Sequence, residues 1–234
     1  MQTIEESIRL FNESWGIYQK IIHNNYMFHR EIGDTVRSFA AEYFGEKPIS
    51  LMDLGCGDAS QTIAAFASCN VQFYQGCDVS SVALALAEQN LNAAGIPHTL
   101  EKTDMLEAVA EHGFDVIFSS FAIHHLDLHQ KETLLKNVRA ALKPDGVLIL
   151  IDLALEADED RHTYLENYLG YAETYWLEMT AGENLAVRNH AAEHDFPEKL
   201  NTYSHLAQQA GFARMRHLCQ HTWHHVLVLE NVSD

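Results

Sequence analysis

A carboxylate, two glycines and a second carboxylate follow an apolar run in the stretch LMDLGCGDAS, residues 51–60. Gly55 and Gly57 favour a tight turn that brings bare backbone against a ligand, as in phosphate-binding loops. Asp53 and Asp58 would repel a phosphate, however, because nearby like charges are unfavourable. The stretch therefore predicts a site for a ligand whose polar end carries positive charge.

Acidic residues also stand at the ends of the next two predicted strands. Asp78 ends the segment VQFYQGCD, 21 residues after Gly57, where its two oxygens can hold a ribose diol. Asp104 ends HTLEKTD, where it can accept a hydrogen bond from an adenine amino group while the Met105 amide faces a ring nitrogen. Both acids could instead be plain helix caps. We expect them at one edge of the sheet, since ligands of open parallel sheets bind beyond the carboxyl ends of the strands.

Strand patterns alternate with helical patterns along most of the chain. Helices are expected at 80–94, from a capping box of Asp127 and Gln130 onward, and at 202–210. The last two strands are so close in sequence that they must be antiparallel neighbours. This order predicts an α/β fold with a Rossmann-like, doubly wound, mostly parallel seven-stranded sheet and an antiparallel C-terminal hairpin. The expected strands cover 49–54, 71–78, 98–104, 114–121, 147–153, 212–219 and 222–230.

Two segments lie outside this alternation. Residues 1–46 show helical spacing with a break near Asn24 and Asn25, and they are predicted to form an N-terminal helical cap on a core of residues 47–234. Residues 155–200 are acidic and rich in aromatic residues, with no strand pattern. They predict a helical lid that is inserted into the core.

Composition restricts the class of protein. The chain has 234 residues, with 15 Lys and Arg against 33 Asp and Glu and a formal net charge of −18. Because nucleic acids and anionic membranes attract basic surfaces, we expect neither as a partner. No apolar run is long enough to span a bilayer, and the N-terminus carries acids where a signal peptide would carry lysines. We expect a cytoplasmic protein that is a monomer or a homodimer.

Four motifs in this order resemble the class I S-adenosylmethionine-dependent methyltransferases: LMDLGCGDAS, GCDVSS, EKTDML, and the stretch from FDVIFSSFAIHHL to KPDGVLILIDL. The resemblance covers about residues 49–153. It implies S-adenosyl-L-methionine as the cofactor, with S-adenosyl-L-homocysteine as the product. It also implies transfer of a methyl group to a small-molecule acceptor.

The resemblance also assigns residues to parts of the cofactor. It implies Asp53 and the Gly55 carbonyl near the methionine end, and Asp78 near the ribose hydroxyls. Ala59 replaces the third glycine of the usual pattern, where a small residue should be tolerated at a helix start. The other cofactor-binding residues that it implies are Cys56, Gly57, Val79, Asp104, Met105, Ser119, Ser120 and Phe121.

Methyl transfer from a sulfonium is an in-line displacement, in which the protein mainly orients the reactants and excludes water. A base is needed only where the acceptor is protonated at rest. His124 follows the fourth strand at the mouth of the expected site, and its imidazole is a candidate base, with His125 a weaker one. The pair could instead simply precede the next helix without any chemical role.

Aromatic residues of the N-terminal cap and the lid predict the acceptor pocket. The candidate substrate-binding residues are Tyr18, Tyr26, Arg30, Tyr175 and Trp176. Arg30 could hold a carboxylate, and the aromatic rings suit a small, partly apolar or aromatic acceptor. Helical aromatic stripes also arise from plain packing.

One histidine pattern points to a different chemistry. His190 and His194 fit the H-x-x-E-H pattern of a zinc peptidase family. The pattern lies in the lid of a nucleotide-type fold, and the sequence indicates no third ligand. The four cysteines show no metal-type spacing either, and we therefore expect no metal.

Two alternatives to the methyltransferase remain open. A NAD(P)-dependent Rossmann oxidoreductase would use Asp78 equally well, although its pyrophosphate would meet Asp53 and Asp58. A non-catalytic nucleoside-binding module would keep the fold without turnover. Titration with S-adenosylmethionine, S-adenosylhomocysteine and NAD(P) distinguishes these classes.

Overall fold

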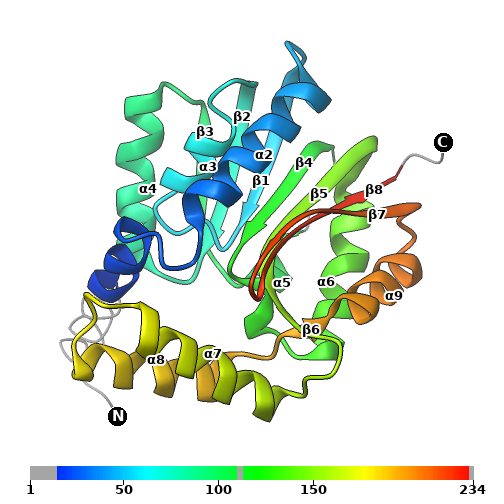
Figure 1. Cartoon of the computed structure of the whole chain (residues 1–234). Helices are drawn as coiled ribbons and strands as arrows, with labels where there is room; N and C mark the ends of the chain where they lie inside the picture. Colours follow the sequence, from blue (N-terminus) through cyan, green and yellow to red (C-terminus); the bar gives the residue numbers. More distant parts are fainter. Residues whose placement is uncertain (1–14, 110–112, 232–234) are drawn as a thin grey trace.

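The computed structural model describes residues 15–109 and 113–231. Its centre is an eight-stranded sheet with the order β3-β2-β1-β4-β5-β8-β7, and a short strand β6 pairs with β5 (Figure 1). The strands from β1 to β5 are parallel, whereas β8 runs antiparallel to β5 and β7 antiparallel to β8. The strands are β1 (Pro48–Leu54), β2 (Asn70–Asp78), β3 (His98–Lys102), β4 (Phe114–Ser120), β5 (Leu142–Leu155), β6 (Glu198–Lys199), β7 (Arg214–His221) and β8 (His224–Glu230).

Helices cover both faces of the sheet, and two more lie across the carboxyl ends of the parallel strands (Figure 1). A helical stretch at 15–23 precedes the first complete helix. The helices are α2 (His29–Phe44), α3 (Ser60–Ala65), α4 (Ser81–Ala94), α5 (Met105–Ala108), the short 3₁₀ helix η1 (Ile123–His125), α6 (Leu128–Ala141), α7 (Arg161–Tyr175), α8 (Ala181–His194) and α9 (Leu200–Ala210).

Strand alternation divides the core into two layers. Leu51 of β1 packs with α2, α3 and α4 on one face, whereas its neighbour Met52 packs with α5, α6 and α9 on the other. Both side chains are fully buried. Because successive side chains of a strand point to opposite faces, a strand covered on both sides needs the continuous apolar run seen here.

A third apolar cluster joins the lid to the N-terminal part of the chain. We call residues 161–194, which contain α7 and α8, the α7–α8 segment. Its Tyr168 and Trp176 pack with Ile21 and Met27, and with Leu153 at the end of β5. The Lys20 ammonium lies 2.9 Å from the Glu183 carboxylate and pairs with it. The two segments that lie outside the alternation of strands and helices are therefore packed on each other.

The predicted mostly parallel α/β sheet with its antiparallel hairpin is confirmed, and so is the capping box of Asp127 and Gln130. Seven strands was an undercount, because residues 198–199 of the predicted lid pair with the end of β5. Strand β5, from Leu142 to Leu155, begins earlier and ends later than the strand expected at 147–153. The helical break near Asn25 is confirmed, since residues 24–27 form a turn. Residues 1–14 of the predicted cap lie outside the described residues.

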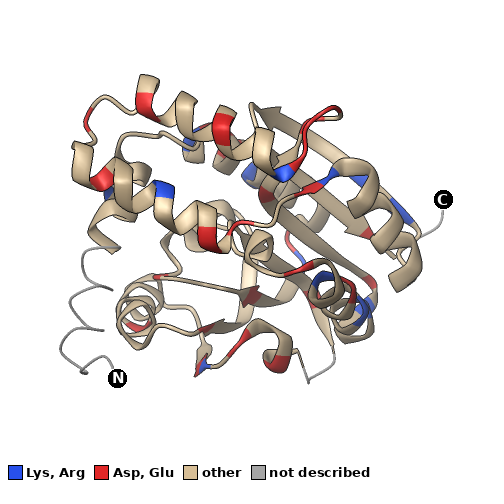
Figure 2. Ribbon diagram, turned by 90° about the horizontal axis from the view of Figure 1, so that it is seen from below, with Lys and Arg blue, Asp and Glu red and all other residues tan. Residues whose placement is uncertain are grey.

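Charged residues of both signs are spread over the helices in the view of Figure 2, and Lys and Arg form no continuous stripe there. Within residues 15–109 and 113–231, no helix combines the length and the apolarity that crossing a bilayer requires.

Asp53 of β1 is a buried carboxylate that ties three elements together. It is 1% exposed, and its Oδ2 accepts hydrogen bonds from the Thr62 hydroxyl of α3 at 2.5 Å and the Tyr74 hydroxyl of β2 at 2.7 Å. Burial raises the pKa of the Asp53 carboxyl to about 6, although these two hydrogen bonds oppose the shift. Asp53 therefore positions the start of α3 against the sheet.

The raised pKa of Asp53 predicts a pH-dependent stability. An unfolded Asp has a pKa of about 3.9, so between about pH 4 and pH 6 the folded chain keeps a proton that the unfolded chain releases. The stabilisation that comes from holding this proton on Asp53 is lost as the pH rises through that window. The free energy of unfolding of Asp53→Asn and of the wild type is measured with urea at about pH 4.5 and about pH 7. The value for Asp53→Asn minus that for the wild type should be about 2 kcal/mol higher at the upper pH. Asp34→Asn, an exposed acid of α2, is the control. An equal difference at both pH values would contradict the prediction.

Candidate functional site

A cavity of about 450 Å³ lies at the carboxyl ends of the strands, between the sheet and the α7–α8 segment. The order of the sheet reverses between β1 and β4, which is where open α/β sheets bind their ligands. One end of the cavity is lined by the turn after β1 and by the ends of β2 and β3. The other end is lined by residues 120–125, the α7–α8 segment and the N-terminal helical stretch.

The turn after β1 exposes its backbone to the cavity. Gly55 and Gly57 both have positive φ, of 71° and 55°. A Cβ on Gly55 would lie 2.7 Å from the Cβ of Ala122, whereas a Cβ on Gly57 would meet nothing closer than Trp15 at 4.0 Å. Ala59, also with positive φ, stands at the start of α3 as expected. The first glycine is needed for packing, and the second leaves room for a ligand beside the backbone.

Asp78 joins this turn to the start of α4. Its Oδ2 accepts a hydrogen bond from the Gly57 amide at 2.9 Å, and its Oδ1 accepts one from the Ser80 amide at 2.8 Å. Ser80, not Asp78, caps α4, because its hydroxyl accepts from the Ala83 amide. The Asp78 carboxylate lines the cavity and keeps lone pairs for a diol. Next to it, Val79 is 66% exposed and presents an apolar side chain at the cavity wall.

Asp104 has both of the roles that the sequence left open. Its Oδ1 accepts a hydrogen bond from the Leu106 amide at 2.8 Å and so caps α5. It also lines the cavity, together with Met105. A carboxylate beside two apolar walls fits an adenine ring with its amino group, and the Asp78 carboxylate fits a ribose. The residues at this end of the cavity therefore fit an adenosine.

Three of the expected cofactor-binding residues do not line the cavity. Asp53 lies beneath the glycine turn, with its carboxylate bonded to Thr62 and Tyr74. Cys56 is buried there too, and burial raises the pKa of its thiol. Ser119 is fully buried, and its hydroxyl donates to the Leu54 carbonyl at 3.0 Å. Ser120 and Phe121, which follow it, do line the cavity.

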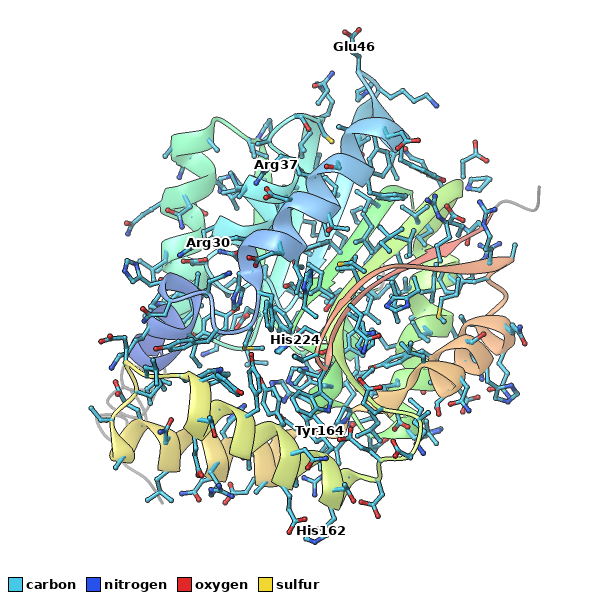
Figure 3. All side chains as sticks on the ribbon, viewed as in Figure 1. Arg30, Arg37, Glu46, His162, Tyr164 and His224 are labelled. Carbon is cyan, nitrogen blue, oxygen red and sulfur yellow. The ribbon has the colours of Figure 1, made fainter. Side chains whose placement is uncertain are left out.

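Of the five predicted substrate-binding residues, two line the cavity and three do not. Tyr18 and Trp176 line the cavity. Tyr26 does not, but it stacks on Trp176 with a centroid distance of 5.4 Å and an interplanar angle of 3°. Arg30, near the start of α2 in Figure 3, is exposed, and its guanidinium donates to the His23 carbonyl. Tyr175 is 60% exposed and contacts Tyr171 instead.

His124 lies between two buried carboxylates. Its Nδ1 pairs closely with Asp152 Oδ1 at the end of β5, and its Nε2 lies 3.7 Å from Asp195 Oδ1, just after α8. Burial lowers the pKa of His124, but the charges of Asp152 and Asp195 outweigh it and raise the pKa above its usual value. The ring also lines the cavity. Because Nδ1 is held by Asp152, only Nε2 is available for a ligand.

His125 completes this cluster. Its Nδ1 lies 3.1 Å from the His194 carbonyl and 3.7 Å from Asp195 Oδ1. Burial and the neighbouring charge of His124 lower the pKa of His125 to about 3. His190 of α8 packs edge-on against His125, with a centroid distance of 5.2 Å, and lines the same cavity.

Backbone contacts hold Asp195 against His124. The Phe196 amide donates to the His124 carbonyl at 2.7 Å, and the Arg161 Nε donates to the Asp195 carbonyl at 2.6 Å. The buried Lys131 ammonium donates to the Leu126 and Phe196 carbonyls, and so joins the same two loops. These contacts bring residues from two distant parts of the sequence to one end of the cavity.

Sequence reasoning missed Asp152 and Asp195. Asp152 carried a signal, because it is a carboxylate inside the otherwise apolar run VLILIDL. Asp195 carried none, since it follows the H-x-x-E-H pattern as one acid among several.

A further buried histidine lies between the sheet and the α7–α8 segment. Figure 3 shows His224 and Tyr164 there, whereas His162 points outward. His224 is fully buried, and burial lowers its pKa to about 3.

Comparison with known proteins agrees with this geometry. The model of a family described as "Methyltransferase domain" matches residues 52–148. The chain is 23% identical over 220 residues to the carboxy-S-adenosyl-L-methionine synthase of Desulforapulum autotrophicum, which covers 88% of this chain and 84% of that protein.

Solved structures share the fold at low sequence identity. Mitomycin 7-O-methyltransferase superposes with a TM-score of 0.59 at 16% identity, over 93% of this chain and 60% of that chain. The S-adenosylmethionine-dependent methyltransferase SibL superposes with a TM-score of 0.58 at 17% identity, over 81% and 51%. This chain thus spans between half and two thirds of these two proteins. The domain match and the similarity to the synthase support the resemblance to the class I S-adenosylmethionine-dependent methyltransferases, and the solved structures show that the fold is shared.

Proposed function

We propose that the protein transfers a methyl group from S-adenosylmethionine to a small acceptor that binds beneath the α7–α8 segment. The observation that carries this proposal is the continuity of the cavity. Asp78 and Asp104 line one end, and His124 and Trp176 line the other. Cofactor and acceptor can therefore lie in contact in one space, as an in-line displacement requires.

Residues of the chain define the cofactor end of this cavity. Asp78 would hold the ribose hydroxyls, Asp104 the adenine amino group, and Val79 and Met105 the faces of the ring. The backbone at Gly55 and Gly57 would lie along the methionine moiety. When bound, the cofactor supplies a methyl group on a positively charged sulfur, which leaves as a neutral thioether.

The acceptor end favours a flat, mainly apolar molecule. Ile21, Met27, Tyr168, Trp176 and Val187 line it. The indole Nε1 of Trp176 is buried and has no hydrogen-bond partner among the described residues. A polar atom of an acceptor could accept from it, because a buried donor without a partner is unfavourable. Tyr26 stacks behind the indole and fixes its plane.

The position of His124 supports its predicted role as a base. The Asp152 carboxylate orients the ring through Nδ1, so that Nε2 is the nitrogen that an acceptor can reach. A carboxylate–imidazole pair of this kind can take a proton from a hydroxyl or amine as the methyl group arrives. The weaker prediction, a role for His125, lacks this support, because its Nδ1 lies against a carbonyl.

A second candidate follows from the curated relative. The name of that relative describes synthesis of a carboxylated S-adenosylmethionine, and the alignment covers most of both chains. In this case the protein would modify the cofactor itself. The two candidates differ in their products, because only methyl transfer leaves S-adenosylhomocysteine and a labelled second molecule.

Labelled methyl groups test the proposal directly. The protein is incubated with S-adenosylmethionine that carries an isotopic methyl label and with a fractionated metabolite extract, and the products are followed by mass spectrometry. We expect stoichiometric S-adenosylhomocysteine and label in a small molecule. A new sulfonium nucleoside without released S-adenosylhomocysteine would favour the second candidate. Binding of the cofactor without any turnover would favour the non-catalytic module.

Asp78→Ala should weaken binding of S-adenosylhomocysteine by about 10- to 100-fold in calorimetric titration, since hydrogen bonds to a charged group contribute about 1.5–3 kcal/mol. NAD and NADP should bind neither protein. Asp34→Ala, an exposed acid of α2, is the matched control. Thermal unfolding checks that the Gly57 turn is intact. Unchanged affinity in a folded Asp78→Ala protein, or tight binding of NAD, would overturn the cofactor assignment.

His124→Gln should lower kcat for the identified acceptor by about 10²- to 10⁴-fold, the usual contribution of a general base. The dissociation constant of S-adenosylhomocysteine should change little, because His124 lies at the other end of the cavity. His129→Gln, which alters an exposed histidine of α6, should leave both values unchanged. A His124→Gln enzyme with wild-type kcat would exclude the base role.

A further inference from the structure

We propose that His124, His125 and Asp195 form a binding site for a divalent first-row transition metal ion, of the zinc or iron(II) class, at the acceptor end of the cavity. Each residue offers one ligand atom, and the three atoms all lie within 4.8 Å of one another. Two imidazoles and one carboxylate suit such ions, whereas Mg²⁺ and Ca²⁺ prefer oxygen ligands.

The three ligand atoms lie around a common point. Asp195 Oδ1 lies 3.7 Å from His124 Nε2 and 3.7 Å from His125 Nδ1. Zinc is bound at about 2.0–2.2 Å by nitrogen and oxygen ligands. An ion between the three atoms would draw them closer together, and His125 Nδ1 would exchange its 3.1 Å contact with the His194 carbonyl for the ion.

A carboxylate oxygen without a partner points to the same site independently. Asp195 Oδ1 is buried and accepts no hydrogen bond from any described residue. The same holds for Oδ2 of Asp152, on the other side of His124. An unsatisfied buried carboxylate oxygen is costly, and a bound cation removes that penalty.

The arrangement around His124 is one that metal sites use. A histidine ligand usually donates its other ring N–H to a carboxylate, which fixes the tautomer and raises the basicity of the ligating nitrogen. Asp152 holds His124 Nδ1 in this way and leaves Nε2 toward Asp195. Asp152 is thus a positioning residue for the site.

Charge balance favours a doubly charged ion. Asp152 and Asp195 are both buried, and two nearby cations have other partners. The Lys131 ammonium lies 3.7 Å from the Glu198 carboxylate, and the Arg161 guanidinium donates to the backbone carbonyls of Asp195 and Ala192. An imidazolium at His124 would neutralise only one of the two carboxylates. A divalent ion held by neutral imidazoles would neutralise both.

The site would also have an open side. All three ligand residues line the cavity. Three protein ligands with a free coordination position are typical of catalytic rather than structural sites. If the proposed transferase function holds, an acceptor oxygen or nitrogen could take that position. With the ion bound, His124 would be a ligand and not the base, because the same nitrogen cannot both bind a metal and accept a proton.

The test measures metal binding without any activity assay. The full chain is treated with a chelator and titrated with Co²⁺, whose visible absorption reports imidazole and carboxylate ligands, and Zn²⁺ is then added as a competitor. We expect one Co²⁺ per chain, displaced by one Zn²⁺. Asp195→Asn and His125→Gln should each weaken binding roughly 100-fold or more, and Asp152→Asn about 10- to 100-fold.

The control separates this site from the sequence pattern at 190–194. His194→Gln removes one histidine of H-x-x-E-H, and its exposed ring is not among the proposed ligands. This variant should bind Co²⁺ like the wild type. Titration with S-adenosylhomocysteine shows that each variant is folded, and a failed transferase would leave the metal result intact. Absence of a 1:1 complex in the wild type would overturn the proposal. Binding that is lost in His194→Gln but kept in Asp195→Asn would do the same.

Discussion

A buried carboxylate at the end of an apolar strand determines much of the site. Asp152 lies in β5, between two layers of apolar side chains, and needs a partner because an isolated buried charge is strongly unfavourable. His124 supplies that partner from the loop after β4. The position of His124 in turn fixes the loop at 195–199, through the Phe196 amide and the Lys131 ammonium. The α7–α8 segment ends at this loop, so the pair of Asp152 and His124 helps to place one wall of the cavity, together with the apolar cluster around Trp176.

The sequence was sufficient for the core, because the core follows local rules. Apolar runs such as VLILIDL predict strands covered on both faces, and a capping box at Asp127 marks the start of a helix. The acids at the strand ends were placed correctly for the same reason: parallel strands bring their carboxyl ends to one edge. Asp78 and Asp104 line the cavity as expected. The charge argument that pointed to a cationic ligand changes in part, however, because Asp53 is hydrogen-bonded beneath the turn.

The end of the cavity beneath the α7–α8 segment could not be predicted, because it depends on contacts between distant segments. Tyr18 and Trp176 were chosen for their residue type, and both line the cavity. Arg30 and Tyr175 were chosen in the same way, yet one donates to a nearby carbonyl and the other faces solvent. Helical spacing alone does not say which face of α7 is covered. The pairing of Asp195 with His124 is of the same kind, since 71 residues separate them in the sequence.

The wall opposite the cofactor end is built from two pieces, the helical stretch at 15–23 and the α7–α8 segment, which precede and interrupt the core respectively. Neither piece contributes a strand to the region between β1 and β4, where the sheet order reverses. Natural variation in either piece can therefore reshape the chamber while the nucleoside half stays intact. Relatives with the same sheet can thus diverge in the molecules they accept.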